Sequence, residues 1–254
     1  MTVPLLHLRG LEKRYGGMLG PATVAVAGVD LDVFPGEVVG LIGESGCGKT
    51  SLVRAALGLV RRDGGTVRVL GQDPADLGGA ALTALRRRAQ LLLQDPGASL
   101  NPGLSLRATI AESARVHRPD APSAVADALA RMDLSHRADA YPHQLSGGER
   151  RRATLAMLWL ADPELTIADE PTAGLDAARK AEVLDLLLER RRPGAGFLLI
   201  SHDLPLVLYA CTRVVVMSQG RLVDTFTADT LADAPRHPLT RRLLWAAGML
   251  AEPA

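Results

Sequence analysis

The sequence predicts an α/β fold that carries an antiparallel β-layer and a helical insertion. Apolar, β-branched runs of strand length alternate with segments of helical periodicity, which is typical of a mostly parallel sheet. Near the N-terminus, residues 5–11 and 23–34 alternate apolar and polar side chains, as half-buried antiparallel strands do. From about residue 95 to 160 the periodicity is helical, with no strand pattern between the helices. These three observations indicate one layered domain with an inserted helical unit.

The individual elements follow from the same patterns. Buried strands are predicted at 38–42, 90–93, 165–170 and 197–200, a short strand at 66–70, and a final hairpin at 214–217 and 221–223. Helices are predicted at 51–57, 82–88, 104–116, 124–134, 150–161 and 176–191, and a further apolar helical run ends at Cys211. We therefore expect a single domain over 1–254, in which 1–94 and 160–225 form the β-layer and core, 95–159 a helical subdomain, and 226–254 a short tail.

Composition limits the functional classes. The chain has 29 basic and 28 acidic residues, so its charge does not indicate a surface for nucleic acid, and none is expected as a partner. The two cysteines make neither a disulfide framework nor a metal set. The first ten residues lack the order of a signal peptide, and the longest apolar run, 155–161, is far shorter than the ~20 residues that span a bilayer. We expect a soluble protein of a reducing cytoplasm.

The most informative stretch is GESGCGKT at 43–50, which follows the strand at 38–42 and precedes a helix. This is the G-x-x-x-x-G-K-[ST] phosphate loop in the strand–loop–helix context that supports it. The glycines permit a tight loop of inward-pointing N–H groups, and the helix N-terminus favours an anion. We expect Lys49 to reach the β- and γ-phosphates of a nucleoside triphosphate and the Thr50 hydroxyl to ligate Mg²⁺. The bland alternative is a glycine-rich turn before a structural helix.

A second chemical element closes the strand at 165–170, which ends in two adjacent carboxylates, Asp169 and Glu170. Side chains alternate along a strand, so neighbours at its end can serve different atoms. We expect Asp169 to hold Mg²⁺ and Glu170 to act on the attacking water as general base. The bland alternative is that the pair caps the next helix. Asp176, which opens that helix, is also a candidate N-cap.

Two weaker signals accompany these motifs. Ser146-Gly147-Gly148 precedes a helix and could hold an anion at its N-terminus, although such residues are also ordinary cap and turn residues. His202 follows the core strand 197–200, where parallel sheets bind ligands, whereas the other five histidines lie in polar or loop contexts. Tyr15 is a candidate ligand contact, but a partly buried edge tyrosine explains it equally well.

Together these elements resemble the ATP-binding subunit of an ABC transporter over nearly the whole chain. The resemblance rests on motifs in the family's order: Walker A at 43–50, a glutamine loop at Gln94, LSGGE at 145–149, Walker B with its glutamate at 165–170, a D-loop through Asp176, and His202. It implies a P-loop NTPase (RecA-like) core, ATPase activity, and the cofactors ATP and Mg²⁺. It implies ATP contacts from the residues Gly43, Glu44, Ser45, Gly46, Cys47, Gly48, Lys49, Thr50 and Ser51.

The resemblance also assigns roles outside the phosphate loop. It implies that Tyr15 stacks on adenine, and that Gln94 senses Mg²⁺ and water and couples to a membrane partner. Ser146, Gly147 and Gly148 would close on the γ-phosphate held by an opposite subunit, with Asp176 nearby. The implied catalytic set is Glu170, His202, Gln94 and Lys49, and the implied Mg²⁺ set is Thr50, Gln94 and Asp169.

Two stretches, QDPGASLNP at 94–102 and HPLTRRLL at 237–244, are similar to importers of oligopeptides, dipeptides or nickel. This similarity implies membrane permease subunits, a solute-binding protein and a second ATPase chain, either a distinct homologue, which we favour, or a second copy. It implies a peripheral place on the cytoplasmic face of a bacterial membrane. The family more often has Gln where this chain has Glu149 after the signature glycines, so the similarity does not identify the transported solute. The alternative is an ABC-type ATPase of a non-transport complex, acting in phosphonate degradation or on nucleic acid.

Overall fold

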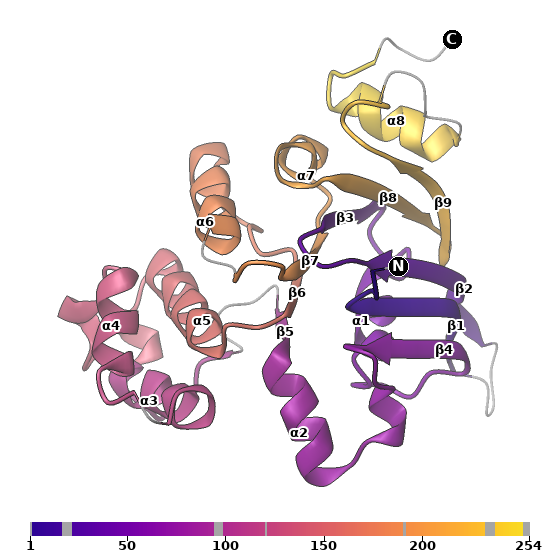
Figure 1. Cartoon of the computed structure of the whole chain (residues 1–254). Coiled ribbons are helices and arrows are strands. Elements are labelled where there is room, and N and C mark those ends of the chain that lie inside the picture. The colour runs from indigo at the N-terminus through magenta and orange to yellow at the C-terminus, as the bar shows by residue number, and fades with distance from the viewer. Residues whose placement is uncertain are drawn as a thin grey trace.

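The central sheet has six strands in the order β5-β6-β7-β3-β8-β9 (Figure 1). The computed structural model describes residues 2–16, 22–93, 99–119, 121–189, 192–231 and 237–250. The first five strands of this order are parallel and the last pair is antiparallel. They are β5 (Ala89–Leu92), β6 (Leu165–Asp169), β7 (Gly196–Ile200), β3 (Val38–Gly43), β8 (Arg213–Ser218) and β9 (Arg221–Phe226). Strands β3, β6 and β7 are buried throughout, which explains their continuous apolar sequences.

A second, antiparallel sheet has three strands in the order β2-β1-β4: β2 (Thr23–Val33), β1 (Leu6–Tyr15) and β4 (Gly64–Val69). The predicted α/β class with an antiparallel layer is therefore confirmed. The short strand predicted at 66–70 belongs to this layer, because β4 pairs with β1. Helix α1 (Lys49–Ala56) packs between the two sheets, since its buried face and both sheets share one apolar cluster.

The helical insertion packs around its own part of the core. Helices α3 (Leu106–His117), α4 (Ala124–Arg131) and α5 (Gly147–Ala161) lie together on the side of the molecule opposite the antiparallel sheet (Figure 1). Ile110, Ala128 and Ala153, one from each helix, are completely buried in one cluster. Short 3₁₀ turns at Ser135–Arg137 and Pro142–Gln144 lead from α4 to α5.

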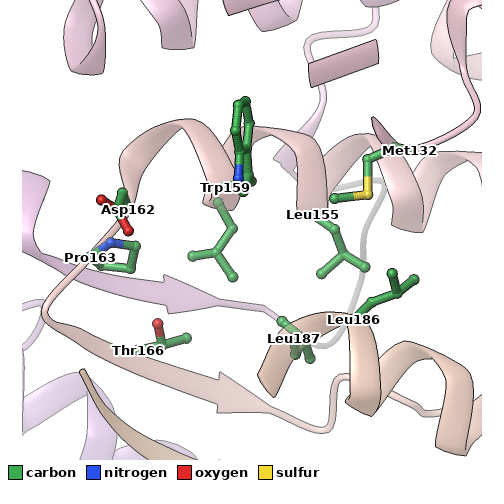
Figure 2. Close-up of a pocket in the computed structure, with 9 residues that line it drawn as sticks. Met132, Leu155, Trp159, Asp162, Pro163, Thr166, Leu186 and Leu187 are labelled. Carbon is green, nitrogen blue, oxygen red and sulfur yellow. The ribbon is translucent and has the colours of Figure 1, made fainter. Parts of the chain in front are cut away.

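Helix α5 is the element through which the insertion meets the sheet. Figure 2 shows Leu155 of α5 pointing toward Leu187 of α6 (Ala177–Glu189), whereas the ring of Trp159 points away from Leu187 and from Thr166 of β6. The gap between these elements holds only about 30 Å³ and is mostly apolar. A volume of one or two water molecules excludes an organic ligand, so this seam is a packing contact between the insertion and the core.

The remaining helices cover the edges. Helix α2 (Gly79–Arg88), preceded by a 3₁₀ turn at Pro74–Asp76, leads into β5. Helix α7 (Leu204–Ala210) is the apolar helical run expected before Cys211, and burial raises the pKa of the Cys211 thiol to about 12. The tail forms α8 (Pro238–Ala246), which buries Leu239 and Leu244 in the cluster that also contains Phe226 of β9. No helix in the described ranges combines the length and apolar character needed to cross a bilayer.

Candidate functional site

The predicted site residues meet at the carboxyl ends of three neighbouring strands. Strand β7 lies between β3 and β6, and Ile200, its last residue, pairs with Leu41 on one side and Asp169 on the other. The segments that follow these strands therefore leave the sheet along one edge. They carry the phosphate loop, Glu170 and His202, which are far apart in sequence. This edge is where open parallel sheets bind ligands.

The phosphate loop has the conformation that its glycines were expected to permit. Gly48 has φ 112°, and a Cβ there would lie 2.0 Å from the Ala25 carbonyl oxygen, so only glycine fits. A Cβ on Gly43 would lie 2.2 Å from the Met217 carbonyl oxygen. Because Gly48 is the N-cap of α1, no side chain caps the first N–H groups of this helix. Those donors remain available to an anion, as the sequence predicted.

Lys49 folds back over this loop. Its Nζ donates hydrogen bonds to the carbonyl oxygens of Gly43, at 2.8 Å, and Glu44, at 3.0 Å, and lies 3.8 Å from Cys47 Sγ. None of the ion pairs among the described residues includes Lys49, so its charge has only neutral partners there. Glu44, Ser45 and Gly46 at the loop tip are exposed, whereas Cys47 is buried. The ammonium group is thus held at the loop with its charge uncompensated.

Thr50 and Asp169 form the first direct contact between the two strong motifs. Thr50 Oγ1 donates a 2.9 Å hydrogen bond to Asp169 Oδ2. Burial raises the pKa of Asp169 above its ordinary value, the Thr50 hydrogen bond opposes that rise, and the nearby Glu170 charge adds to it. A buried carboxylate beside a hydroxyl is a hard oxygen pair that suits Mg²⁺. The described residues contain no group of three His, Cys, Asp or Glu side chains arranged for a metal. Mg²⁺ bound mainly through phosphates and water needs no such group.

Glu170 and His202 form the second contact. His202 Nδ1 lies 2.8 Å from Glu170 Oε1, and the Ser201 hydroxyl donates to Glu170 Oε2 at 3.4 Å. Glu170 adopts φ 50°, the left-handed region that costs a non-glycine residue energy. Its own N–H donates to the Ile200 carbonyl oxygen at 2.9 Å, which holds that conformation. The carboxylate is therefore fixed by two side chains from the end of the neighbouring strand.

Asp203 follows His202 and makes two side-chain contacts. Its Oδ1 accepts from the Leu206 N–H at 3.2 Å, capping α7, and its Oδ2 lies 2.5 Å from Lys180 Nζ on α6. Burial alone would raise the pKa of Asp203, but these hydrogen bonds and the Lys180 charge lower it below the ordinary value. Lys180 is one of only three lysines in the chain. The segment 201–203 is thus bound to both α6 and α7.

The signature serine caps α5. The Ser146 hydroxyl oxygen accepts from the Glu149 N–H at 3.2 Å, while Glu149 Oε2 accepts from the Ser146 N–H at 2.7 Å, which makes a capping box. Arg137 Nε donates to Glu149 Oε1 at 2.7 Å, and this bond is the main cause that lowers the pKa of Glu149 to about 2. Glu149, which stands where Gln is more usual, is therefore ionised and paired with Arg137.

Gly147 and Gly148 face open space. A Cβ on Gly147 would meet nothing within 4 Å, and one on Gly148 would meet only the tip of Arg152 at 4.0 Å. Neither glycine has a positive φ. Both line a cleft of about 630 Å³ between the start of α5, the loop 173–175 and α6. Nothing within the described chain requires glycine at these two positions.

Three further predictions have separate outcomes. Tyr15 lies at the end of β1 with 41% of its surface exposed and Lys13 Nζ 5.0 Å from its ring centre. An adenine contact for Tyr15 stays a prediction. Asp176 caps α6, because its Oδ1 accepts from the Arg179 N–H at 3.1 Å, which matches the capping alternative. Gln94 lies outside the described residues.

Sequence reasoning did not single out several residues that contact this site. Arg242 of α8 donates to Glu44 Oε1 at 3.2 Å, and Arg151 of α5 donates to the Ala173 carbonyl oxygen at 3.0 Å. Ser201 and Asp203 were visible beside His202 but were given no role. The run Arg150-Arg151-Arg152 predicts a solvated face, which is wrong for Arg151 because it is buried, and no local pattern marks Arg242. Their partners lie far away in sequence or on loops, so only the fold reveals them.

Comparison with known proteins gives a consistent result. A family model described as "ABC transporter" matches residues 26–173. Glutathione import ATP-binding protein GsiA of Pectobacterium atrosepticum is 40% identical over 253 residues, covering 95% of this chain and 41% of GsiA. A putative peptide import ATP-binding protein of Brucella ovis is 37% identical over 248 residues, covering 95% of this chain and 78% of that protein. This chain thus spans less than half of GsiA and most of the Brucella relative.

Solved structures agree with the fold. The structure of an ATP-binding subunit of an ABC transporter superposes with a TM-score of 0.77 at 24% identity, covering 98% of this chain and 95% of that chain. The cbiO1 protein of Clostridium perfringens, described as part of the cbiONQ ABC transporter complex, superposes with a TM-score of 0.75 at 27% identity, covering 91% of each chain. The predicted P-loop core with its β-layer and helical insertion is confirmed at the level of the fold.

Proposed function

This chain belongs to the ABC transporter family, as its motifs indicated, and on that premise we propose that it is the ATP-binding and ATP-hydrolysing subunit of an importer. One observation carries the chemical part of this proposal. The phosphate loop, the Thr50–Asp169 pair and the Glu170–His202 pair lie along one edge of the sheet. An enzyme that splits a phosphoanhydride needs a cradle, a metal site and a group that acts on water, and this edge offers all three.

The loop fits the phosphates of ATP. The uncapped N–H groups at the start of α1 and the Lys49 ammonium supply donors and positive charge without a competing carboxylate on Lys49. Lys49 now donates to main-chain carbonyl oxygens, and the phosphate oxygens of ATP would replace these weaker, neutral acceptors. Tyr15 would contribute ground-state binding by stacking on adenine. Together these contacts bind and orient the triphosphate.

The residues present also fit Mg²⁺. Thr50 and Asp169 would hold the ion through hydroxyl and carboxylate oxygens, and Gln94 would be a third contact. When bound, Mg²⁺ neutralises charge on the phosphate oxygens. The raised pKa of Asp169 reflects burial without a cation, since a nearby positive charge favours the ionised carboxylate.

In this proposal Glu170 is the group that would act on water. Hydrogen bonds with His202 and Ser201 orient its carboxylate, so the carboxylate already has one fixed orientation before ATP binds. As general base, Glu170 would polarise the attacking water and take its proton as the bond from the water oxygen to the γ-phosphorus forms, while the bond from that phosphorus to the bridging oxygen breaks and ADP leaves. The Nδ1 atom of His202 forms a hydrogen bond with Glu170, so its Nε2 atom would be available for a second contact with the γ-phosphate.

Ser146, Gly147 and Gly148 complete the site of another chain in this proposal. Their openness supports it, because two residues without side chains beside open space leave room for a surface that approaches from outside. The capping box orients the Ser146 hydroxyl, whose proton is not used by Glu149, toward an acceptor. ATP would then join two chains head to tail, and hydrolysis would release them.

The transport part of the proposal rests on the relatives. Their names include glutathione and peptide import, and this agrees with the importer-like stretches at 94–102 and 237–244. We propose a peptide as solute, membrane permease subunits, a solute-binding protein and a distinct homologous ATPase chain as partners, at the cytoplasmic face of a bacterial membrane. These names favour import over a phosphonate-degrading or nucleic-acid-associated ATPase.

Reconstitution tests this assignment. The chain, the permease subunits and the ATPase encoded beside it are placed in liposomes with the neighbouring solute-binding protein. We expect Mg²⁺-dependent ATP hydrolysis that rises when a peptide-loaded binding protein is added, together with uptake of that peptide. A hydrolysis rate that does not change with the membrane subunits but rises with nucleic acid would contradict the importer assignment and favour a nucleic-acid-associated ATPase.

A further inference from the structure

Arg151 is a buried arginine with almost no compensation. It lies on α5, five residues after Ser146, and only 8% of its surface is exposed. Its Nη2 donates a 3.0 Å hydrogen bond to the Ala173 carbonyl oxygen, and its Nη1 has no hydrogen-bond partner in the described part of the chain. Burial lowers the pKa of Arg151 below its ordinary value.

The burial of the Arg151 charge does not stabilise the folded state. A buried charge that lacks a carboxylate partner loses more hydration energy than one carbonyl contact returns. Among the described residues, the charged side chains that line the same cleft are Arg150, Arg152, Arg179 and Glu182, and none of them forms an ion pair with Arg151. An apolar side chain of similar length would be at least as stable there. The single contact with Ala173 is therefore the feature to explain.

Ala173 belongs to the turn that begins at Glu170. The Ala173 N–H donates to the Glu170 carbonyl oxygen at 3.1 Å, and Glu170 is held in its left-handed conformation at the head of that turn. The Arg151 guanidinium therefore links the helix that starts at Ser146 to the turn that carries the general base. In the seam of Figure 2 the other half of α5 packs on β6, the strand that ends at Asp169.

We infer that Arg151 is a positioning residue, which sets the orientation of Glu170 according to the position of the α5 N-terminus. This inference rests on the proposed role of Glu170. When Ser146 engages its ligand, α5 is fixed, and the bond from Arg151 to Ala173 holds the turn so that the Glu170 carboxylate faces the water. Arg151 contacts neither ATP nor water itself.

Arg151→Met tests this inference, with Arg151→Lys as the conservative variant. Arg118→Met is the matched control, because Arg118 Nε donates at 3.2 Å to the Leu160 carbonyl oxygen at the other end of α5. In Arg151→Met we expect kcat to fall roughly tenfold or more, as misplacement of a catalytic group does, with the KM for ATP unchanged. The unfolding midpoint should stay equal or rise. Arg151→Lys should recover part of kcat, and Arg118→Met should keep it.

A structural role predicts a different pattern. If the unfolding midpoint falls in step with kcat, or if KM rises while kcat stays, the inference is wrong. The decisive comparison uses the Glu170→Gln background, measured by single-turnover hydrolysis. Because Arg151 acts through Glu170, Arg151→Met should add no further loss there, and an additional tenfold loss would overturn the inference. Normal hydrolysis in the single variant Glu170→Gln would instead contradict the role of Glu170 as general base. Arg151 could then not act through Glu170.

Discussion

Thr50 Oγ1 and Asp169 Oδ2 are joined by a 2.9 Å hydrogen bond, although the two residues are 119 positions apart in the sequence. The contact brings the helix after the phosphate loop to the end of the neighbouring carboxylate strand. It also keeps the buried Asp169 side chain bonded before a cation arrives. In the proposed role, Asp169 would bind Mg·ATP through a carboxylate whose ionised form is disfavoured by burial.

Asp169→Asn should separate stability from metal binding. Burial raises the pKa of Asp169, so the folded state loses stability when the carboxylate ionises and regains it as pH falls toward the folded pKa. At neutral pH and without nucleotide, Asp169→Asn should therefore unfold at the same or a higher temperature than the parent. Mg²⁺ and ATP together should stabilise the parent by about 2.7 kcal/mol at 100 times Kd, but the variant no more than ATP alone. An equal Mg²⁺-dependent shift in both proteins would contradict the metal role.

Tyr15→Ala tests the adenine contact. Stacking stabilises the ground state and the transition state equally, so the KM for ATP should rise while kcat stays unchanged. The loss of binding free energy should be about 1–3 kcal/mol if the contact resembles other base–aromatic stacking. Tyr209→Ala is the control, because Tyr209 is also exposed and its hydroxyl bonds Asp185 on a different face. An unchanged KM in Tyr15→Ala would leave Tyr15 as an edge tyrosine that packs under Lys13.

The shared site predicts a specific pattern when this chain is paired with its homologous ATPase partner. Lys49→Ala inactivates the site whose phosphate loop belongs to this chain. Ser146→Arg inactivates the other site, whose phosphate loop belongs to the partner and whose signature serine comes from this chain. Each variant should keep roughly half of the hydrolysis if the two sites act independently, and the double variant should keep none. If each site were built within one chain, the double variant would keep as much as either single variant.

The same variants decide whether the chain also pairs with itself. Lys49→Ala and Ser146→Arg chains mixed without the partner form one intact site in each mixed dimer. Random pairing would then restore roughly a quarter of the parental activity. We expect no recovery in this mixture, because the proposed partner is a distinct chain. Recovery near a quarter would establish a working homodimer.

The sequence revealed the parts of this site that depend on local chemistry. Gly48, Lys49 and Thr50 could be singled out as candidates because a strand, a loop and a helix follow each other without interruption. Asp169 and Glu170 could be singled out because their strand is continuous and apolar. The order of strands could not be read, since β3 and β6 are separated by β7, which comes later in the chain than either.

Contacts between distant segments were equally invisible. The His202–Glu170 bond spans 32 residues and the Arg242–Glu44 contact spans 198, and neither has a sequence pattern that fixes it. The strand at 64–69 was recognisable as a strand, but its partner β1 depends on the packing of α1 between the two sheets. Local propensity decides which elements form, and tertiary packing decides which of them meet.

Glu170→Gln compared with Lys49→Ala tests the central claim most directly. Glu170→Gln keeps the phosphate cradle but removes the group that acts on water, so it should bind ATP with Mg²⁺ as the parent does and hydrolyse it at least 100-fold more slowly, on the order of a lost general base. Lys49→Ala should fail to bind ATP. The measurement is nucleotide affinity and turnover for both variants beside the parent. Normal turnover in Glu170→Gln, or normal ATP affinity in Lys49→Ala, would contradict the account.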